Sequence, residues 1–186
     1  MTEQKNEFLL VEDAICADFL ENVSEINDAI PFPGVFDEEA LERHSFKTPA
    51  AFISWRGFNR LSRDTTGKFT GPAQFSVLVL THGIAGLDAA RYLKIILHRL
   101  IERIEGQTWN LPFVGPAKIQ SVENLHSATY ERNGIASGGI MFEQDIVFGR
   151  SIYAEEQRKA LGAGVAEINE ILGYDEELEV LISTNE

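Results

Sequence analysis

The chain has 186 residues, enough for one well-packed domain and an extension, and its hydrophobic content of 44% is ordinary for a globular protein. Its formal net charge of −13 is uneven: residues 1–50 carry 12 acids and 3 bases, residues 51–150 carry 8 acids and 11 bases, and residues 151–186 carry 9 acids and 2 bases. Because the basic excess is small and confined to the middle, the chain lacks the broad basic face typical of nucleic-acid-binding proteins. No sequence-specific nucleic-acid partner is therefore expected.

Membrane insertion and secretion are not expected either. No apolar run approaches the ~20 residues of a bilayer span, and the polar start MTEQKNEF lacks the apolar core of a signal peptide. Cys16 is the single cysteine, so no disulfide can form within the chain, and a reducing compartment fits.

Residues 3–27 predict the first helix. Apolar residues recur there at helical spacing, with acidic residues between them, and Thr2 is the expected N-cap. The PFPG sequence at 31–34 ends any helical path, because proline lacks a backbone donor and glycine favours a turn. A polar connection follows.

Two strands are predicted next, over residues 51–58 and 73–81. The second strand is apolar at both alternating sets of positions, which indicates a central strand, or a strand covered on both sides by helix or a neighbouring subunit. Residues 86–105 then give the clearest amphipathic helix, with an apolar stripe between basic residues. Gly106 is placed to end this helix in the left-handed conformation.

The last two predicted strands cover residues 118–125 and 135–148. Gly138 and Gly139 indicate a bulge or a close backbone approach. Together the elements predict an α+β domain over residues 1–150: a small four-stranded, mainly antiparallel sheet packed against two long helices. Residues 151–186 are expected to form an acidic extension that docks on this core or on a neighbouring subunit.

No catalytic or metal-binding constellation is visible. None of the histidines has a zinc-binding or catalytic spacing; they are His44, His82, His98 and His126. His98 is expected to be partly buried on the long helix, and Cys16 to be a small core residue. We therefore expect a protein that is not an enzyme and that has no metal or cofactor.

The loop over residues 56–68 is the one cluster that favours a functional interpretation. It carries four cations against a single acid, and two aromatic residues flank it, so it could dock on an acidic surface or on phosphate. The candidate interface residues are Trp55, Arg56, Phe58, Arg60, Arg63 and Lys68. The alternative is an ordinary solvated hairpin tip.

Six stretches of the chain resemble the Mu-like phage tail protein family of tail terminators, or tail completion proteins. They are VEDAICADFL (11–20), TPAAFISWRGFNR (48–60), AQFSVLVLTHG (73–83), LDAARYLKIILHRL (87–100), PFVGPAKIQSVENL (112–125) and GGIMFEQDIVFG (138–149). The resemblance covers about residues 1–150 and consists of element order and residue class, without a catalytic signature.

The resemblance implies a tail-terminator-like fold and a structural role in the virion. Such proteins assemble as rings, usually hexamers, that cap the tail tube, stop its polymerisation and present the joining surface for the head-side connector. In a contractile tail the ring also meets the last ring of the sheath protein. The implied location is the head-proximal end of the virion tail, with the host cytoplasm during assembly.

Two other function classes stay open. One is a different head–tail connector protein, and the other is a small-ligand-binding domain or an enzyme with an unrecognised site. Residues 151–186 lie outside the resemblance and mix apolar and acidic residues. Their Val180, Leu181 and Ile182 could add as a strand to the sheet edge of a neighbour. The alternative for this segment is a helix packed on its own core.

Overall fold

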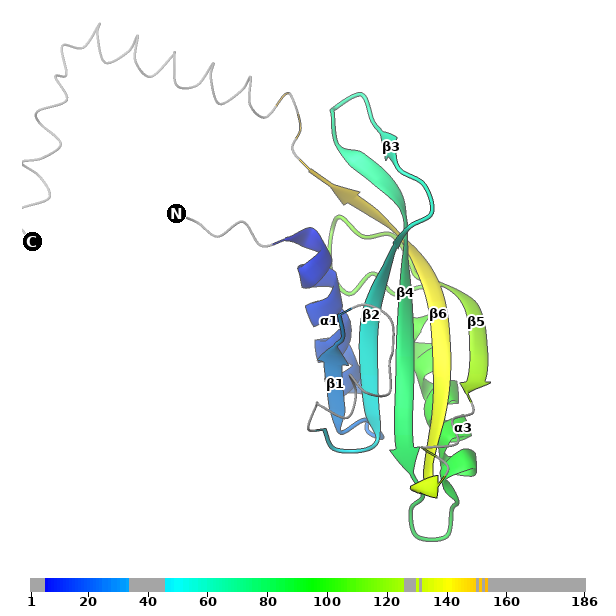
Figure 1. Ribbon diagram of the computed structural model, residues 1–186. Coiled ribbons are helices and arrows are strands. Elements are labelled where there is room, and N and C mark those ends of the chain that lie inside the picture. Colours follow the sequence, from blue (N-terminus) through cyan, green and yellow to red (C-terminus); the bar gives the residue numbers. More distant parts are fainter. Residues whose placement is uncertain are drawn as a thin grey trace, which may run out of the picture. The chain divides into compact units, whose positions relative to one another are not determined.

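In the computed structural model, helices cover one face of a mixed β-sheet (Figure 1). The structure describes residues 6–33, 46–125, 130, 132–149, 151 and 153. Its elements are α1 (Glu7–Asn22), β1 (Asp28–Pro31), β2 (Ala50–Phe58), β3 (Ser62–Arg63), β4 (Phe69–His82), α3 (Ala89–Ile104), β5 (Lys118–Leu125) and β6 (Ile135–Phe148). Residues 63–68, together with residues from 149 onward, group apart from this body and are described by themselves.

The predicted four-stranded, mainly antiparallel sheet is wrong. Over the described residues the sheet has six strands in the order β1-β2-β4-β6-β5, with β3 paired to β4, and β1 runs parallel to β2. β1 was missed because its four residues are too few to show an alternating pattern. Pro31 ends β1 at the sheet edge, where the missing backbone donor costs little.

Both predicted helices are present, but the first is shorter than predicted. α1 starts at Glu7, and Asn6 is its N-cap: the Asn6 Oδ1 accepts a hydrogen bond from the Phe8 N–H at 3.0 Å. The predicted cap, Thr2, lies outside the described residues. The bounds of β2, β5 and β6 agree with the predicted strands to within one residue, and β4 starts four residues earlier than predicted.

The helix α3 has well-defined ends. The Asp88 Oδ1 accepts from the Arg91 N–H at 2.8 Å at its start. At its end Gly106 has a φ of +79°, as the sequence predicted, and its N–H donates to the Ala117 carbonyl at 2.8 Å. Neither of the two described helices is long and apolar enough to cross a membrane.

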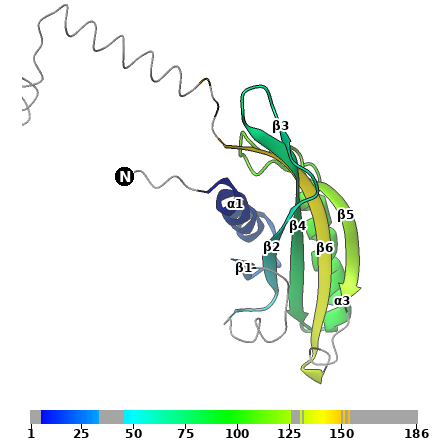
Figure 2. The same cartoon turned by 45° about the horizontal axis from the view of Figure 1, so that its top comes forward.

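The main core lies between the helices and the sheet. α1 lies against β1 and β2, and α3 lies against β4, β5 and β6 (Figure 2). The helices are joined by Arg103, whose Nε donates to the Asp18 Oδ2 at 2.6 Å while its Nη2 contacts the second carboxylate oxygen. A bidentate, partly buried pair of this kind fixes orientation better than an exposed ion pair does.

Gly138 lets α3 approach the sheet closely. A Cβ at this position would lie 2.9 Å from the Leu97 Cδ1, too close for an undisturbed side chain. The pairing of β4 with β6 stays regular here, so the predicted choice between a bulge and a close approach resolves to the close approach. The bulges lie elsewhere, in β2 between Trp55 and Gly57 and in β5 between Ile119 and Ser121.

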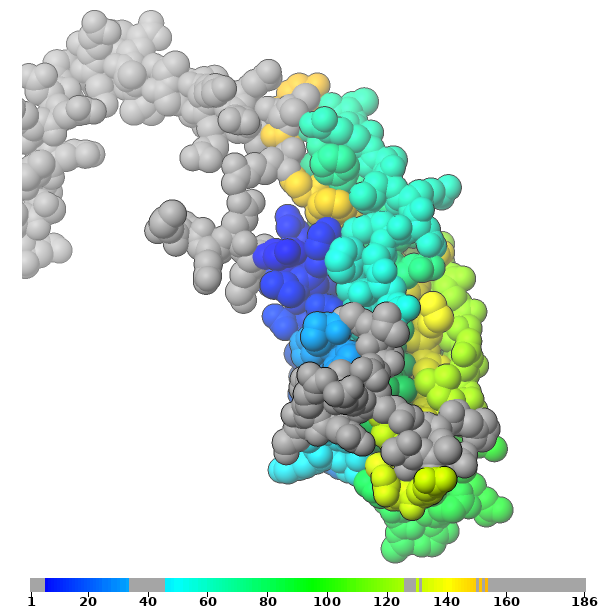
Figure 3. All heavy atoms as spheres, in the orientation of Figure 1, coloured from blue at the N-terminus to red at the C-terminus, as the bar shows by residue number. Residues whose placement is uncertain are grey.

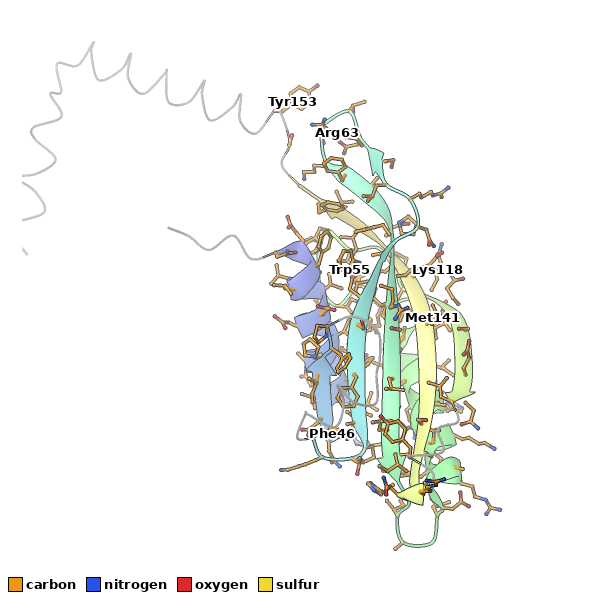
Figure 4. The ribbon with its side chains drawn as sticks, in the orientation of Figure 1. Phe46, Trp55, Arg63, Lys118, Met141 and Tyr153 are labelled. Atoms are coloured by element: carbon orange, nitrogen blue, oxygen red, sulfur yellow. The ribbon has the colours of Figure 1, made fainter. Side chains whose placement is uncertain are left out.

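Of the two interpretations of residues 73–81, the central strand is confirmed. β4 lies between β2 and β6, and its residues from Val77 to Leu80 are all buried. A second apolar cluster packs on the face away from the helices, with the Phe46 ring 5.0 Å from the Phe52 ring (Figure 4). This cluster covers only part of that face, which here is called the open face.

Candidate interaction surface

Trp55 and Phe58 pack inside the protein body, on the helix side of the sheet. The Trp55 ring stacks on the Phe8 ring of α1, with centroids 4.9 Å apart and planes 9° apart. Phe58 meets Phe8 edge-on at 5.5 Å and lies 5.4 Å from Phe148 of β6. These contacts fasten the first turns of α1 to the ends of β2 and β6.

Glu12 reinforces the same contact. Its Oε1 accepts a hydrogen bond from the Trp55 backbone N–H at 2.9 Å, next to the β2 bulge. Burial raises the pKa of the Glu12 carboxyl group, the hydrogen bond from Trp55 lowers it, and the charge of Asp13 raises it, with a net rise. The Trp55 Nε1 is buried and has no hydrogen-bond partner in the described structure.

The β2 bulge separates Arg56 from the two aromatic residues. Arg56 is exposed and lies on the open face, where it lines a hollow of about 180 Å³. The other lining residues come from three further strands: Ser76, Val77 and Leu78 of β4, Ser121, Glu123 and Leu125 of β5, and Gly139 and Met141 of β6. Figure 3 shows this face of the molecule.

The strand register explains why the surface is hollowed here. Leu78, Gly139 and Glu123 are paired in one row across β4, β6 and β5. Because Gly139 has no side chain, the centre of the row is empty, and the Leu125 Cδ1 leans over it, 3.4 Å from where a Cβ would lie. The Ser76 Oγ is buried without a hydrogen-bond partner in the described residues.

The hollow suits a protruding side chain of a protein partner. It is smaller than the roughly 300–1,000 Å³ typical of small-molecule sites. Met141 and Leu125 are exposed apolar residues beside it, and Arg56 and Glu123 bring one charge of each sign. Apolar contacts next to charged and polar groups are the usual composition of a protein–protein contact.

The tip of the β2–β4 connection, described by itself, is a braced turn. The Asp64 Oδ1 accepts hydrogen bonds from the Thr66 hydroxyl, the Thr66 N–H and the Lys68 N–H at 2.7, 2.8 and 3.0 Å. The bond from the Thr66 hydroxyl is the main cause of a lowered pKa of Asp64. The Arg63 Nε donates to the Gly67 carbonyl at 3.0 Å, so this cation helps to hold the turn.

The four cations of the predicted loop therefore have different surroundings. Arg56 belongs to the open face, Arg63 braces the turn, and Arg60 and Lys68 remain as candidates for docking. Arg60 is exposed and Lys68 is half-buried. The remaining candidate interface residues lie outside the described part of the chain; they are Val180, Leu181 and Ile182.

The other singled-out residues have structural surroundings. Cys16 is a core residue, as predicted, and burial raises the pKa of its thiol to about 12. The prediction that His98 is partly buried is wrong: its side chain is 70% exposed, beside Glu102. The His82 Nδ1 lies 2.9 Å from the Thr48 Oγ1. Among the described residues, no three His, Cys, Asp or Glu side chains are grouped to hold a metal ion.

No family model matches the chain, and no curated protein sequence matches it. Sequence reasoning missed the open-face hollow, although one signal for it was present. In β6, Met141 shares its side of the strand with Glu143 and Asp145, so an apolar residue lies next to acidic residues on the side that faces away from the helices.

Proposed function

We propose that the protein is a structural subunit of a phage virion: a tail terminator that caps the tail tube as a ring, expected to be a hexamer. The observation that carries the proposal is the open-face hollow, with its exposed Met141 and Leu125 and its charged rim. This surface has the composition of a protein–protein contact. The resemblance of six sequence stretches to tail terminators supplies the biological role.

Capping requires two different faces on one ring. One face must complement the growing end of the tube. The other face must not bind a further tube subunit and must bind the head-side connector. If the tail contracts, the sheath protein is a further partner. An acidic subunit also suits a ring through which DNA passes without sticking.

The proposal is tested by the mass and the shape of the assembled protein. Purified protein, alone and mixed with tail tubes, is measured by sedimentation or mass photometry and imaged by electron microscopy. We expect closed rings, and we expect tubes of uniform length that end in such a ring. A strictly monomeric protein at tens of micromolar, both with and without tubes, contradicts the proposal.

The braced turn gives a more specific prediction. An Arg60→Ser/Lys68→Ser variant keeps Arg63 and the Asp64 hydrogen bonds, so its stability is expected to change by less than about 1 kcal/mol. If the turn docks on the tube or on a neighbouring subunit, the variant yields tubes of irregular length or tails without heads in electron micrographs.

The matched control for this variant is Arg91→Ser/Arg132→Ser. It removes two exposed cations elsewhere in the body and is expected to leave tail completion unchanged. Normal virion yields from the Arg60→Ser/Lys68→Ser variant would show that the turn does not dock. It would then be an ordinary solvated hairpin tip, the alternative expected from the sequence.

A different head–tail connector protein is the closest alternative role. It would also form rings, but it would copurify with heads and would leave tube length unchanged when deleted. The open-face hollow does not favour the ligand-binding alternative, because it is smaller than typical ligand sites.

A further inference from the structure

The helix α1 has apolar residues on two sides. Its inward side is buried in the core through Val11, Ile15 and Phe19. Its outward side carries Leu9 and Leu20, which are 58% and 49% exposed. A single exposed leucine is unremarkable, but two in register on one short helix indicate a stripe that a partner covers.

Helix geometry places this stripe on the flank of α1 that points away from α3. Leu9, Asp13 and Leu20 follow at positions i, i+4 and i+11, so they form one line of roughly 16 Å. Asp18, which binds Arg103 of α3, lies about half a turn around the helix from Leu9. Leu9, Asp13 and Leu20 are called the α1 flank below.

The α1 flank is also acidic. α1 contains five acidic residues and no basic residue: Glu7, Glu12, Asp13, Asp18 and Glu21. Asp18 is neutralised by Arg103 and Glu12 is half-buried, while Asp13 is exposed and makes no ion pair in the described structure. A partner for this flank must combine apolar surface with positive charge.

The far side of α3 has that combination. Lys94, Ile95, His98 and Arg99 line a shallow hollow of about 370 Å³, and Ile95 is 41% exposed. Lys94 forms no ion pair with another described residue, whereas Arg99 is already close to Glu25 and Glu102. Lys94 lies about half a turn around α3 from Arg103, the residue that faces α1. Lys94, Ile95 and His98 are called the α3 flank.

We infer that the α1 flank of one copy of this chain packs on the α3 flank of the next copy. Leucines 9 and 20 of the first copy would cover Ile95 of the second, and Asp13 would pair with Lys94. The inference rests on the proposed ring and names its subunit contact.

The arrangement of the two flanks fixes the type of assembly. They point away from each other at the two ends of one helix layer, so one copy cannot satisfy both of its own flanks. Two copies joined through one contact still leave one α1 flank and one α3 flank free. Such a contact is heterologous, and further copies can add until a ring closes. The acidic segment 151–186 is a poor occupant of the α1 flank, because both are negatively charged.

The test uses two variants of the full chain, each damaged on one flank. Leu9→Ser/Leu20→Ser damages the α1 flank and keeps Asp13, and Lys94→Asp/Ile95→Ser damages the α3 flank, so the two damaged flanks also repel each other. All four side chains are exposed, so both variants are expected to keep the circular dichroism spectrum of the parent. Each variant alone is expected to lose the ring and to sediment as a monomer.

Mixing the two variants gives the decisive result. Each retains the flank that the other lacks, so an equimolar mixture is expected to form one-to-one heterodimers and no ring. The charge exchange Asp13→Lys/Lys94→Asp within one chain is expected to restore ring formation. An Ile84→Ser variant, which removes an exposed apolar residue between β4 and α3, serves as the control and is expected to form rings normally.

The outcomes separate this inference from the proposed function. Rings from both damaged variants, under conditions in which the parent forms rings, overturn the α1–α3 contact and leave the ring proposal intact. Loss of rings only in a Val180→Ser/Leu181→Ser/Ile182→Ser variant also overturns it and makes the C-terminal segment the connecting element. A parent protein that stays monomeric with and without tubes overturns the proposed function itself.

Discussion

A Leu97→Asp variant is expected not to fold. Leu97 is 7% exposed, and its Cδ1 occupies the space that Gly138 leaves free between α3 and β6. An aspartate here would place a charge among apolar side chains, and it would also remove the leucine's packing. An unpaired buried charge and a lost core side chain each cost several kcal/mol. Their sum is comparable with the roughly 5–15 kcal/mol that stabilises a typical domain.

The measurement is a thermal melt followed by circular dichroism, together with the elution volume on gel filtration. The matched control is Arg91→Asp, which puts the same side chain at an exposed position in the first turn of the same helix. An acid is favourable there because of the helix dipole, so only a small change is expected. A cooperative melt of Leu97→Asp within a few degrees of the parent would show that this face of α3 is not part of the core.

The elements with long, regular patterns were predictable from the sequence. The apolar stripe of α3 and the alternation in β6 each repeat several times, and both elements lie where the periodicity placed them. β1 has four residues, and its parallel pairing with β2 depends on a contact between segments about 20 residues apart. Local patterns carry no information on such pairing, so the sheet was predicted with too few strands and without a parallel pair.

The candidate interface was only partly predictable, and one bulge explains why. In a regular strand, Trp55 and Phe58 would face opposite sides, because they are three residues apart. The bulge between Trp55 and Gly57 turns both rings toward α1 and leaves Arg56 on the open face. The sequence grouped the three residues into one basic, aromatic loop, and the structure divides them between the two faces of the sheet.

Gln144 is a polar residue at a position that the sequence pattern assigns to the core. It falls on the same side of β6 as Phe142 and Ile146, and it is 1% exposed. Its Oε1 accepts a hydrogen bond from the Trp109 Nε1 at 2.8 Å, and its Nε2 donates to the Gln107 and Gly115 carbonyls, both at 2.7 Å. A buried amide with three good partners holds the chain segment between α3 and β5 against the sheet.

This segment needs the support because part of its backbone has an unfavourable conformation. Trp109 and Asn110 have φ values of 55° and 56°, in the left-handed region that non-glycine residues rarely occupy. The Trp109 ring nevertheless reaches the core, 6.1 Å from the Phe19 ring of α1 and 6.3 Å from the Phe142 ring. The hydrogen bond from its indole to Gln144 therefore ties a strained turn to both layers of the fold.

A Gln144→Ala variant is expected to lose about 3–5 kcal/mol of unfolding free energy. The substitution leaves the Trp109 indole N–H and the Gly115 carbonyl without their partner, at roughly 1–3 kcal/mol for each buried group left unsatisfied, whereas the Gln107 carbonyl keeps the Ala117 N–H at 2.9 Å. Solvent entering the space of the missing side chain can satisfy some of these groups, which keeps the expected loss below the full sum. The measurement is urea denaturation followed by tryptophan fluorescence and by circular dichroism.

Two further variants separate the hydrogen bonds from the loss of volume. Gln144→Glu keeps an acceptor for the Trp109 indole but turns carboxylate oxygens toward the Gln107 and Gly115 carbonyls, so it is expected to be as destabilising as alanine at neutral pH and less so in acid. Gln120→Ala removes an exposed glutamine from β5 and is expected to change stability by less than about 0.5 kcal/mol. If Gln144→Ala lowers the unfolding free energy no more than this control does, the buried amide is not what holds the segment between α3 and β5. The left-handed turn at Trp109 is then stable without it.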